Sequence, residues 1–118
     1  MDIVEDSRIY EYDDKITDFL YKISKDIKTD IEIDDTLDLV FDFVDDLLCI
    51  DVKLGDLFLE KAIDFIESIN VNILVGILTI TNGCKKYLIN YNKFLNIIKE
   101  HLLLKYGEEE TYSILIGF

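Results

Sequence analysis

The chain has 118 residues, a length that suits one folded domain. Half of its residues are hydrophobic, so the sequence does not belong to the intrinsically disordered class despite a net charge of −13. That charge argues against direct binding to DNA, RNA or an anionic membrane, because each of these attracts a basic surface.

The acidic residues are concentrated in the first part of the chain. Residues 1–67 hold 21 of the 25 acids and 7 of the 12 bases, a net charge of −14, whereas residues 68–118 hold 4 acids and 5 bases, a net charge of +1. An asymmetry of this size bears on partners and solubility rather than on fold. The first residues are acidic and lack the apolar core of a signal peptide, and the longest apolar run, residues 71–80, is about half of the ~20 residues that a membrane span needs. We therefore expect a soluble, cytoplasmic protein that does not enter a membrane.

Helical periodicity begins at Asp14. Residues 1–13 have weak periodicity and are predicted as a loose arm, an ordered arm or a short strand. From Asp14 onward, hydrophobic residues recur every three or four positions, which predicts a helix over 15–28 with Asp13 or Asp14 as its N-cap. The apolar positions of this helix are Ile16, Phe19, Leu20, Ile23 and Ile27.

Residues 34–49, DDTLDLVFDFVDDLLC, predict a second helix with Asp34 or Asp35 as its N-cap. Aspartates occupy one side of it, within an arc of about 120° on the helical wheel. These are Asp34, Asp38, Asp42, Asp45 and Asp46. Like charges three or four residues apart repel by roughly 0.2–0.5 kcal/mol per pair, so the fold tolerates these acids rather than requires them. The remaining arc is broad and apolar, which predicts a central position in the fold for this helix, with residues Leu37, Leu39, Val40, Phe41, Phe43, Val44, Leu47 and Leu48.

A turn around Gly55 is predicted to lead into a third helix over 56–69. The next segment, VNILVGILTITN at 71–82, is apolar on nearly all sides, so periodicity does not separate a buried helix from a buried strand. Its β-branched residues favour a strand, whereas its helical neighbours favour a helix. We predict a helix over 70–82, in which Gly76 lets a neighbouring helix approach closely.

The last part of the chain predicts two more helices. Asn82 and Gly83 form a helix stop, and Asn92 is the predicted N-cap of a helix over 93–106 that ends at Gly107. A short helix follows in EEETYSILIGF, with three glutamates in its first turn, where the helix dipole favours negative charge.

The predicted fold is an all-α, compact single-domain bundle of five or six helices over residues 1–118. We expect the second and fourth helices to be the most buried. Leu115 and Phe118 are predicted to fold back onto the bundle.

Three stretches of the second half carry a resemblance to a known group of proteins. They are NILVGILTIT (72–81), KYLINYNKFLNIIKEHLL (86–103) and YSILIGF (112–118). Their order resembles that of small, uncharacterised α-helical proteins of tailed bacteriophages, over roughly the last 47 residues. In those proteins an apolar helix, a loop, an amphipathic helix opened by an aromatic residue and a Leu/Gly-ended tail follow one another. The resemblance implies phage origin and an α-helical fold, and it supplies no catalytic residue. The loop of those proteins is commonly basic and contains proline, whereas the loop here is basic only, with Lys85 and Lys86.

Sequence motifs for catalysis are not evident. The one histidine, His101, lies in a predicted helix without a matched nucleophile, and the five glycines are isolated rather than gathered in a phosphate loop. Cys49 and Cys84 are 35 residues apart and are predicted to be reduced, buried residues. We predict that the protein is not an enzyme and has no cofactor.

The sequence also predicts no metal site. The segment that starts at Asp51 begins like an EF-hand loop, but Lys53 occupies a ligand position and Ala62 stands where a bidentate glutamate is needed. One histidine and two distant cysteines do not match the ligand spacing of a zinc site.

The acidic stripe therefore supplies the leading functional hypothesis. We predict a non-enzymatic interaction protein that binds a basic surface of a host or defence protein and modulates or inhibits that protein. One form of this hypothesis is that the acidic stripe mimics nucleic acid. The predicted partner-binding residues are Asp34, Asp38, Asp42, Asp45 and Asp46.

Two alternatives remain open. In the first, the acids only give solubility, and the protein is a structural or self-assembling one whose segments 71–80 and 112–118 pack between protomers. In the second, the protein is an enzyme with an unrecognised carboxylate site, which requires a deep pocket lined by several acids.

Overall fold

Helices form nearly all of the described chain. The computed structural model describes the backbone of residues 3–118 and the side chains of residues 10–118. Six α-helices and two 3-10 helices follow one another in the described chain, which contains no strand. The prediction of an all-α single-domain bundle is confirmed. The elements are α1 (Ile3–Ile23), α2 (Asp30–Ile50), α3 (Val52–Ala62), η1 (Ile63–Ser68), α4 (Val71–Asn82), η2 (Lys85–Tyr87), α5 (Tyr91–Tyr106) and α6 (Glu108–Ile114).

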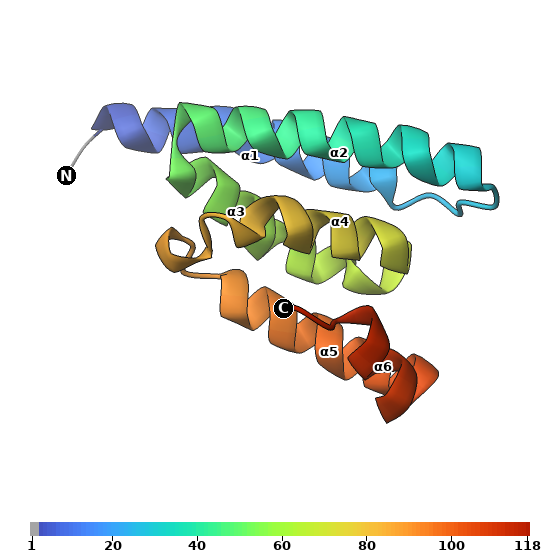
Figure 1. Ribbon diagram of the computed structural model, residues 1–118. Helices are drawn as coiled ribbons and strands as arrows, with labels where there is room; N and C mark the ends of the chain where they lie inside the picture. Colours follow the sequence, from blue (N-terminus) through green and yellow to red (C-terminus); the bar gives the residue numbers. More distant parts are fainter. Residues whose placement is uncertain (1–2) are drawn as a thin grey trace.

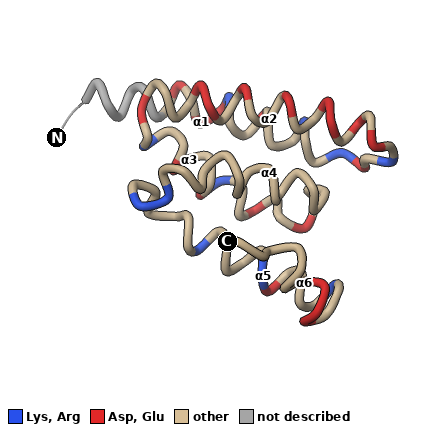
Figure 2. Tube along the Cα trace, viewed as in Figure 1, with Lys and Arg blue, Asp and Glu red and all other residues tan. Residues whose placement is uncertain are grey.

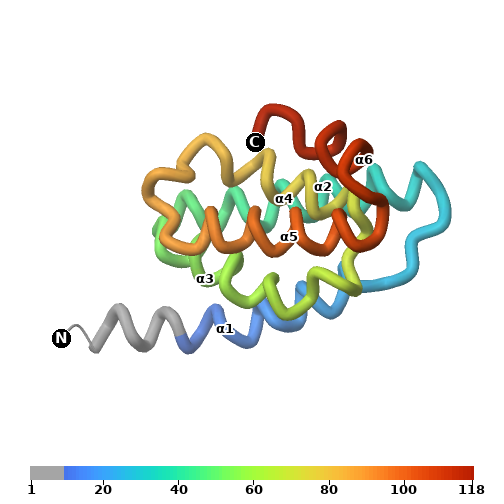
Figure 3. The backbone as a smooth tube through the Cα atoms, turned by 90° about the horizontal axis from the view of Figure 1, so that it is seen from below, coloured from blue at the N-terminus to red at the C-terminus, as the bar shows by residue number. Residues whose placement is uncertain are grey.

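The helices lie in three layers (Figures 1 and 3). One layer holds α1 and α2, the middle layer holds α3, η1 and α4, and the third holds α5 and α6. Burial of a large apolar side chain stabilises a fold by about 1.5–3 kcal/mol, and the middle layer contains many such residues. Those with an exposed fraction of 2% or less are Leu54, Phe58, Leu59, Ala62, Ile66, Ile73, Leu74, Ile77 and Leu78.

The position of α2 corrects the prediction that it is a central helix. Only Val40, Val44 and Leu47 of this helix are fully buried, and Leu39 is 42% exposed. Because α3 and α4 pack against one side of α2, much of its broad apolar arc is only half-buried. The prediction for the fourth helix is correct, since half of the residues of α4 are buried.

Three phenylalanines connect α1, α2 and α3. The rings of Phe19 and Phe43 are stacked with 4.2 Å between centroids, and Phe58 lies at 6.2 Å and 6.1 Å from them. Aromatic pairs of this kind contribute about 0.5–1.5 kcal/mol beyond their burial. The Lys61 ammonium, 2.7 Å from the Asp13 carboxylate, also joins α3 to α1.

α1 starts earlier and ends earlier than predicted. It begins at Ile3, so residues 3–13 are helical rather than a loose arm or a strand, and residues 1–2 lie outside the described part. Extending a formed helix gains one hydrogen bond for each residue ordered, so a segment of weak periodicity is helical where it continues the packed part of α1. The helix ends at Ile23, where the hydroxyl of Ser24 donates to the Leu20 carbonyl oxygen at 2.6 Å.

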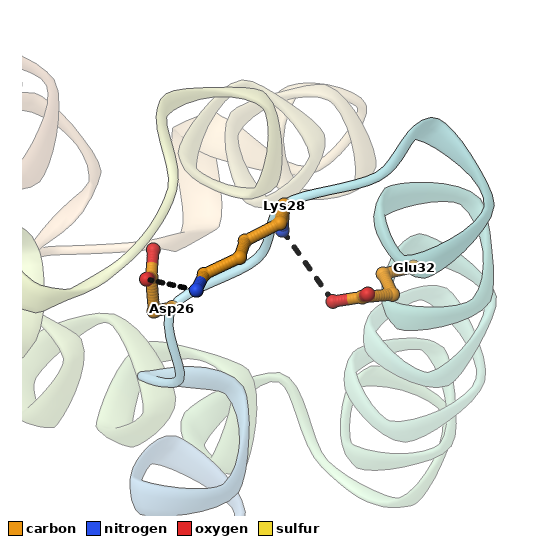
Figure 4. A network of polar contacts seen from close by, with 3 residues as sticks. All are labelled: Asp26, Lys28 and Glu32. Carbon is orange, nitrogen blue, oxygen red and sulfur yellow. Dashed lines mark hydrogen bonds and ion pairs between the residues drawn. The ribbon is translucent and has the colours of Figure 1, made fainter.

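α2 begins at Asp30, not at the predicted Asp34 or Asp35, because Thr29 is its N-cap. The Thr29 hydroxyl accepts a hydrogen bond from the Glu32 amide at 3.1 Å. The Glu32 carboxylate accepts from the Lys28 amide at 3.4 Å, and the Lys28 ammonium lies 3.9 Å from Asp26 (Figure 4). The motif Thr-x-x-Glu is typical of a capping box, and it is present in the sequence.

Gly55 lies inside α3, whereas the sequence predicted a turn there. The Asp51 carboxylate accepts from the Lys53 amide at 3.0 Å and starts the helix. A single helix over 56–69 is also wrong, since α3 ends at Ala62 and continues as the 3-10 helix η1. Gly55 is buried, and Leu48 of α2 occupies the space that a β-carbon would need.

α4 is a helix, which resolves the choice between helix and strand. The Asn70 side chain accepts from the backbone amide two residues later at 2.8 Å, and the helix ends at Asn82, before Gly83, as predicted. Gly76 does allow a close approach, because a β-carbon there would lie 2.5 Å from Cδ2 of Leu37 on α2.

The first helix of the third layer, α5, begins two residues before its predicted start. α5 starts at Tyr91, so its N-cap is Asn90 and not Asn92. It ends at Gly107, as predicted, and the positive φ of 86° there is a backbone conformation that favours glycine. Leu115 and Phe118 pack against the core, which confirms their predicted return to the bundle.

Candidate functional site

The structure places the five predicted aspartates on the solvent side of α2. We call Asp34, Asp38, Asp42, Asp45 and Asp46 the acidic face, and each of them is exposed. Acidic positions recur along the length of α2 in the layer that is remote from α5 and α6 (Figure 2). Residues three and four apart lie side by side on a helix, so these carboxylates form one continuous stripe.

The charge of the acidic face is not compensated by neighbouring bases. α2 contains no lysine or arginine. Among the side chains that the structure describes, none of the five carboxylates forms an ion pair or a hydrogen bond. Lysines elsewhere do pair with acids, as in Lys15 with Glu11 at 3.6 Å and Lys61 with Asp13 at 2.7 Å.

The acidic face lowers the stability of the helix that carries it. Like charges repel on a helix at spacings of three and four residues. The pairs at these spacings are Asp34–Asp38, Asp38–Asp42, Asp42–Asp45 and Asp42–Asp46. Asp45 and Asp46 also lie close to the C-terminal end of α2, where the helix dipole disfavours negative charge. Helix formation therefore depends on the opposite, apolar side of α2.

The acidic face is an open surface and not a pocket. The described surface has a groove of about 1210 Å³ between α5 and α6, and a smaller hollow of about 210 Å³ where α1 leads into α2. None of the five aspartates lines either of them. Paired carboxylates need an enclosed site to act as acid and base, so this surface is better suited to binding than to catalysis.

Other titratable residues are scattered over the fold. Within the described residues, no group of three or more His, Cys, Asp or Glu side chains is placed to hold a metal ion. His101 is half-buried on α5. Cys49 is exposed, which corrects the prediction that both cysteines are buried, because the outer position of α2 leaves its last turn in water. Cys84 is half-buried, and this burial raises the pKa of its thiol.

The sequence predicted only one wall of the groove between α5 and α6. The apolar segment 112–118 was predicted as a contact, but the opposite wall, built by Leu95, Lys99 and Leu103 of α5, was not. The signal for that wall is an apolar residue beside a core position of α5, as at Leu95 beside Phe94 and Leu103 beside Leu102.

The fold and this surface define an all-α protein with an uncompensated acidic helix on its outer layer. Comparisons with known protein families, with curated proteins and with solved structures found no match. No helix in the described part of the chain combines the length and apolar character that crossing a membrane requires.

Proposed function

We propose that the protein is a non-enzymatic interaction protein, encoded by a tailed bacteriophage, that binds a basic surface of a host or defence protein through the acidic face. The observation that supports this most is the presence of five exposed, unpaired carboxylates at spacings where like charges repel on a helix. Residues that lower stability without a structural role are often retained for function. The phage origin derives from the resemblance in the second half of the chain.

The geometry suits recognition by charge. At a rise of about 1.5 Å per residue, the acidic face extends over roughly 18 Å from Asp34 to Asp46. A field of one sign over this length steers a basic partner during encounter and fixes its orientation. Packing of α2 against α3 and α4 holds the carboxylates in place, so little ordering is needed on binding.

Occupation of a basic surface inhibits the partner when that surface has its own ligand. Many basic surfaces bind nucleic acid, and the protein then acts as a competitor for the phosphate backbone. In that version, an excess of duplex DNA displaces the protein from its partner, whereas a partner that binds no nucleic acid is unaffected by the DNA.

Affinity capture from host lysate tests the proposed site. The Asn variant changes Asp34, Asp38, Asp42, Asp45 and Asp46 to Asn. The control variant removes the same amount of charge elsewhere, through the five substitutions Glu11→Gln, Asp14→Asn, Asp18→Asn, Glu100→Gln and Glu110→Gln. We expect wild type and the control variant to retain the same basic protein, and the Asn variant to lose it.

Two results would contradict the proposed site. Equal capture by the Asn variant would mean that the acidic face is not the binding surface. Equal loss in both variants would mean that net charge, rather than this stripe, governs binding.

The alternative function, a self-assembling protein, was predicted to use two contact segments, 71–80 and 112–118. Only the second of them has largely exposed apolar side chains. Residues Ile73, Leu74, Ile77 and Leu78 of the segment 71–80 are fully buried within the protomer. The C-terminal segment, in contrast, has Tyr112 and Ile116 largely exposed, so it remains available for contact between copies.

A further inference from the structure

The third layer contains an open apolar groove. We call it the C-terminal groove. It has a volume of about 1210 Å³ and lies between α5 and the segment formed by α6 and the chain end. Its apolar lining consists of Leu95, Leu103, Tyr112, Leu115, Ile116 and Phe118.

Parts of this lining face water. Tyr112 is 74% exposed and Ile116 is 67% exposed, and both belong to the segment that forms one wall. α6 has seven residues and packs chiefly against α5, and Leu115 and Phe118 after it pack against the core. Tyr112 and Ile116 thus leave apolar side chains in contact with water at the groove.

The charges on the rim of the groove are complementary to one another. Lys99 lies on the α5 wall, and Glu108 and Glu109 lie at the start of α6. In the described part of the chain, none of these three side chains has an ion-pair or hydrogen-bond partner. Both signs of charge therefore lie on one surface, so a second copy of the same surface can offer each of these charges a partner of opposite sign.

The distribution of charge also favours a second copy at this surface. Residues 68–118 carry a net charge of +1, whereas residues 1–67 carry −14. The acidic positions of α1 and α2 lie in the layer remote from α5 and α6 (Figure 2). Two copies that meet at the C-terminal groove thus keep their acidic layers apart and their mutual repulsion low.

We propose that the C-terminal groove is the interface of a symmetric homodimer. Tyr112 and Ile116 of each copy insert into the groove of the other, and Lys99 pairs with the glutamates across the axis. Both acidic faces remain in solvent, at opposite ends of the dimer. This interface does not depend on the proposed function of the acidic face.

Sedimentation equilibrium over a wide range of protein concentration tests the interface. We expect the mass of wild type to rise from 13.8 kDa toward twice that value. The Ile116→Asp variant places a charge in the groove and should remain a monomer. The matched control is Ile89→Asp, because Ile89 is 89% exposed and lies outside the groove, and this variant should dimerise like wild type. Circular dichroism verifies that each exposed substitution leaves the helices intact.

A charge exchange tests the two-fold geometry. Lys99→Glu should weaken the dimer at least several-fold, and the triple variant Lys99→Glu, Glu108→Lys, Glu109→Lys should restore it. Wild type that stays monomeric at every concentration would overturn the proposal. Dimerisation of Ile116→Asp at wild-type strength would also overturn it.

The homodimer and the proposed interaction with a partner protein can be tested independently. The Asn variant should still dimerise but should no longer bind the partner protein. The monomeric Ile116→Asp variant should still bind the partner protein through its acidic face.

Discussion

Asp56 connects α3 to the start of α5 across 34 positions of sequence. Its carboxylate accepts hydrogen bonds from the backbone amide of Asn90 at 2.8 Å and from the side-chain amide of Asn90 at 3.0 Å. The Asn90 side chain therefore does not cap its own helix, and the helix begins there because a remote acid fixes its N-cap residue. Local sequence could not predict this boundary, since the partner belongs to another element.

We predict that Asp56→Ala lowers the free energy of unfolding by about 1–3 kcal/mol, because it leaves a partly buried amide without its acceptor. Asp56→Asn retains one acceptor oxygen and should lose less. Urea denaturation of the three proteins measures the difference. Equal stability of Asp56→Ala and wild type would mean that water replaces the carboxylate without loss.

The two thiols should differ in reactivity. Cys49 is exposed, whereas Cys84 is half-buried and its pKa is raised by burial, so a smaller fraction of Cys84 is thiolate at a given pH. We predict that iodoacetamide modifies Cys49 first, as followed by mass spectrometry of the intact protein and its peptides. Faster modification of Cys84 would show that the end of α4 opens readily.

At the scale of elements, the periodic segments were predictable and their ends were not. α4 and the Gly107 boundary follow from an apolar run and a glycine stop. The start of α2 carries a local signal in Thr29 and Glu32 that was outweighed by the aspartates after it. The start of α3 also carries a local signal, the N-cap Asp51, but Gly55 indicates a turn unless the proximity of Leu48 is known.

Gly55 should tolerate no side chain. A β-carbon there would overlap Cδ2 of Leu48 and lie 3.0 Å from its Cγ, so the half-buried Leu48 side chain would have to shift. Alanine gains up to about 1 kcal/mol of helix propensity, whereas overpacking costs about 1–3 kcal/mol. We predict that Gly55→Ala lowers the midpoint of thermal unfolding.

Gly83→Ala is the matched control for this substitution. Nothing lies within 4 Å of a β-carbon at Gly83, and its φ of −63° suits alanine. It should be neutral or stabilise the protein by about 0.4–1 kcal/mol through the unfolded chain. A Gly55→Ala variant as stable as Gly83→Ala would contradict the close approach of α2 and α3.

At the scale of the whole molecule, the acidic face was predictable and its setting was not. Five aspartates at helical spacing fix which residues share a side of α2. Whether α2 lies at the centre or at the edge depends on how α3 and α4 pack against it, and a broad apolar arc does not determine that packing. The C-terminal groove likewise depends on two elements that meet only in the fold.

We predict that the Asn variant is more stable than wild type. Removal of the repulsion along α2 should raise the free energy of unfolding by about 1–2 kcal/mol at low salt, and by less at high salt, where the charges are screened. Urea denaturation at two ionic strengths checks this. A less stable Asn variant would show that the fold requires these acids, which would remove the main support for a binding role.

The most direct test of that role is the salt dependence of the affinity between the protein and its captured partner. We predict that the dissociation constant rises steeply from low salt to about 0.15 M and beyond, because the charges of the acidic face are exposed and are screened within a Debye length of about 8 Å. The Asn variant should bind weakly with a shallow salt dependence. Wild-type affinity that is unchanged from low to high salt would contradict recognition through the acidic face.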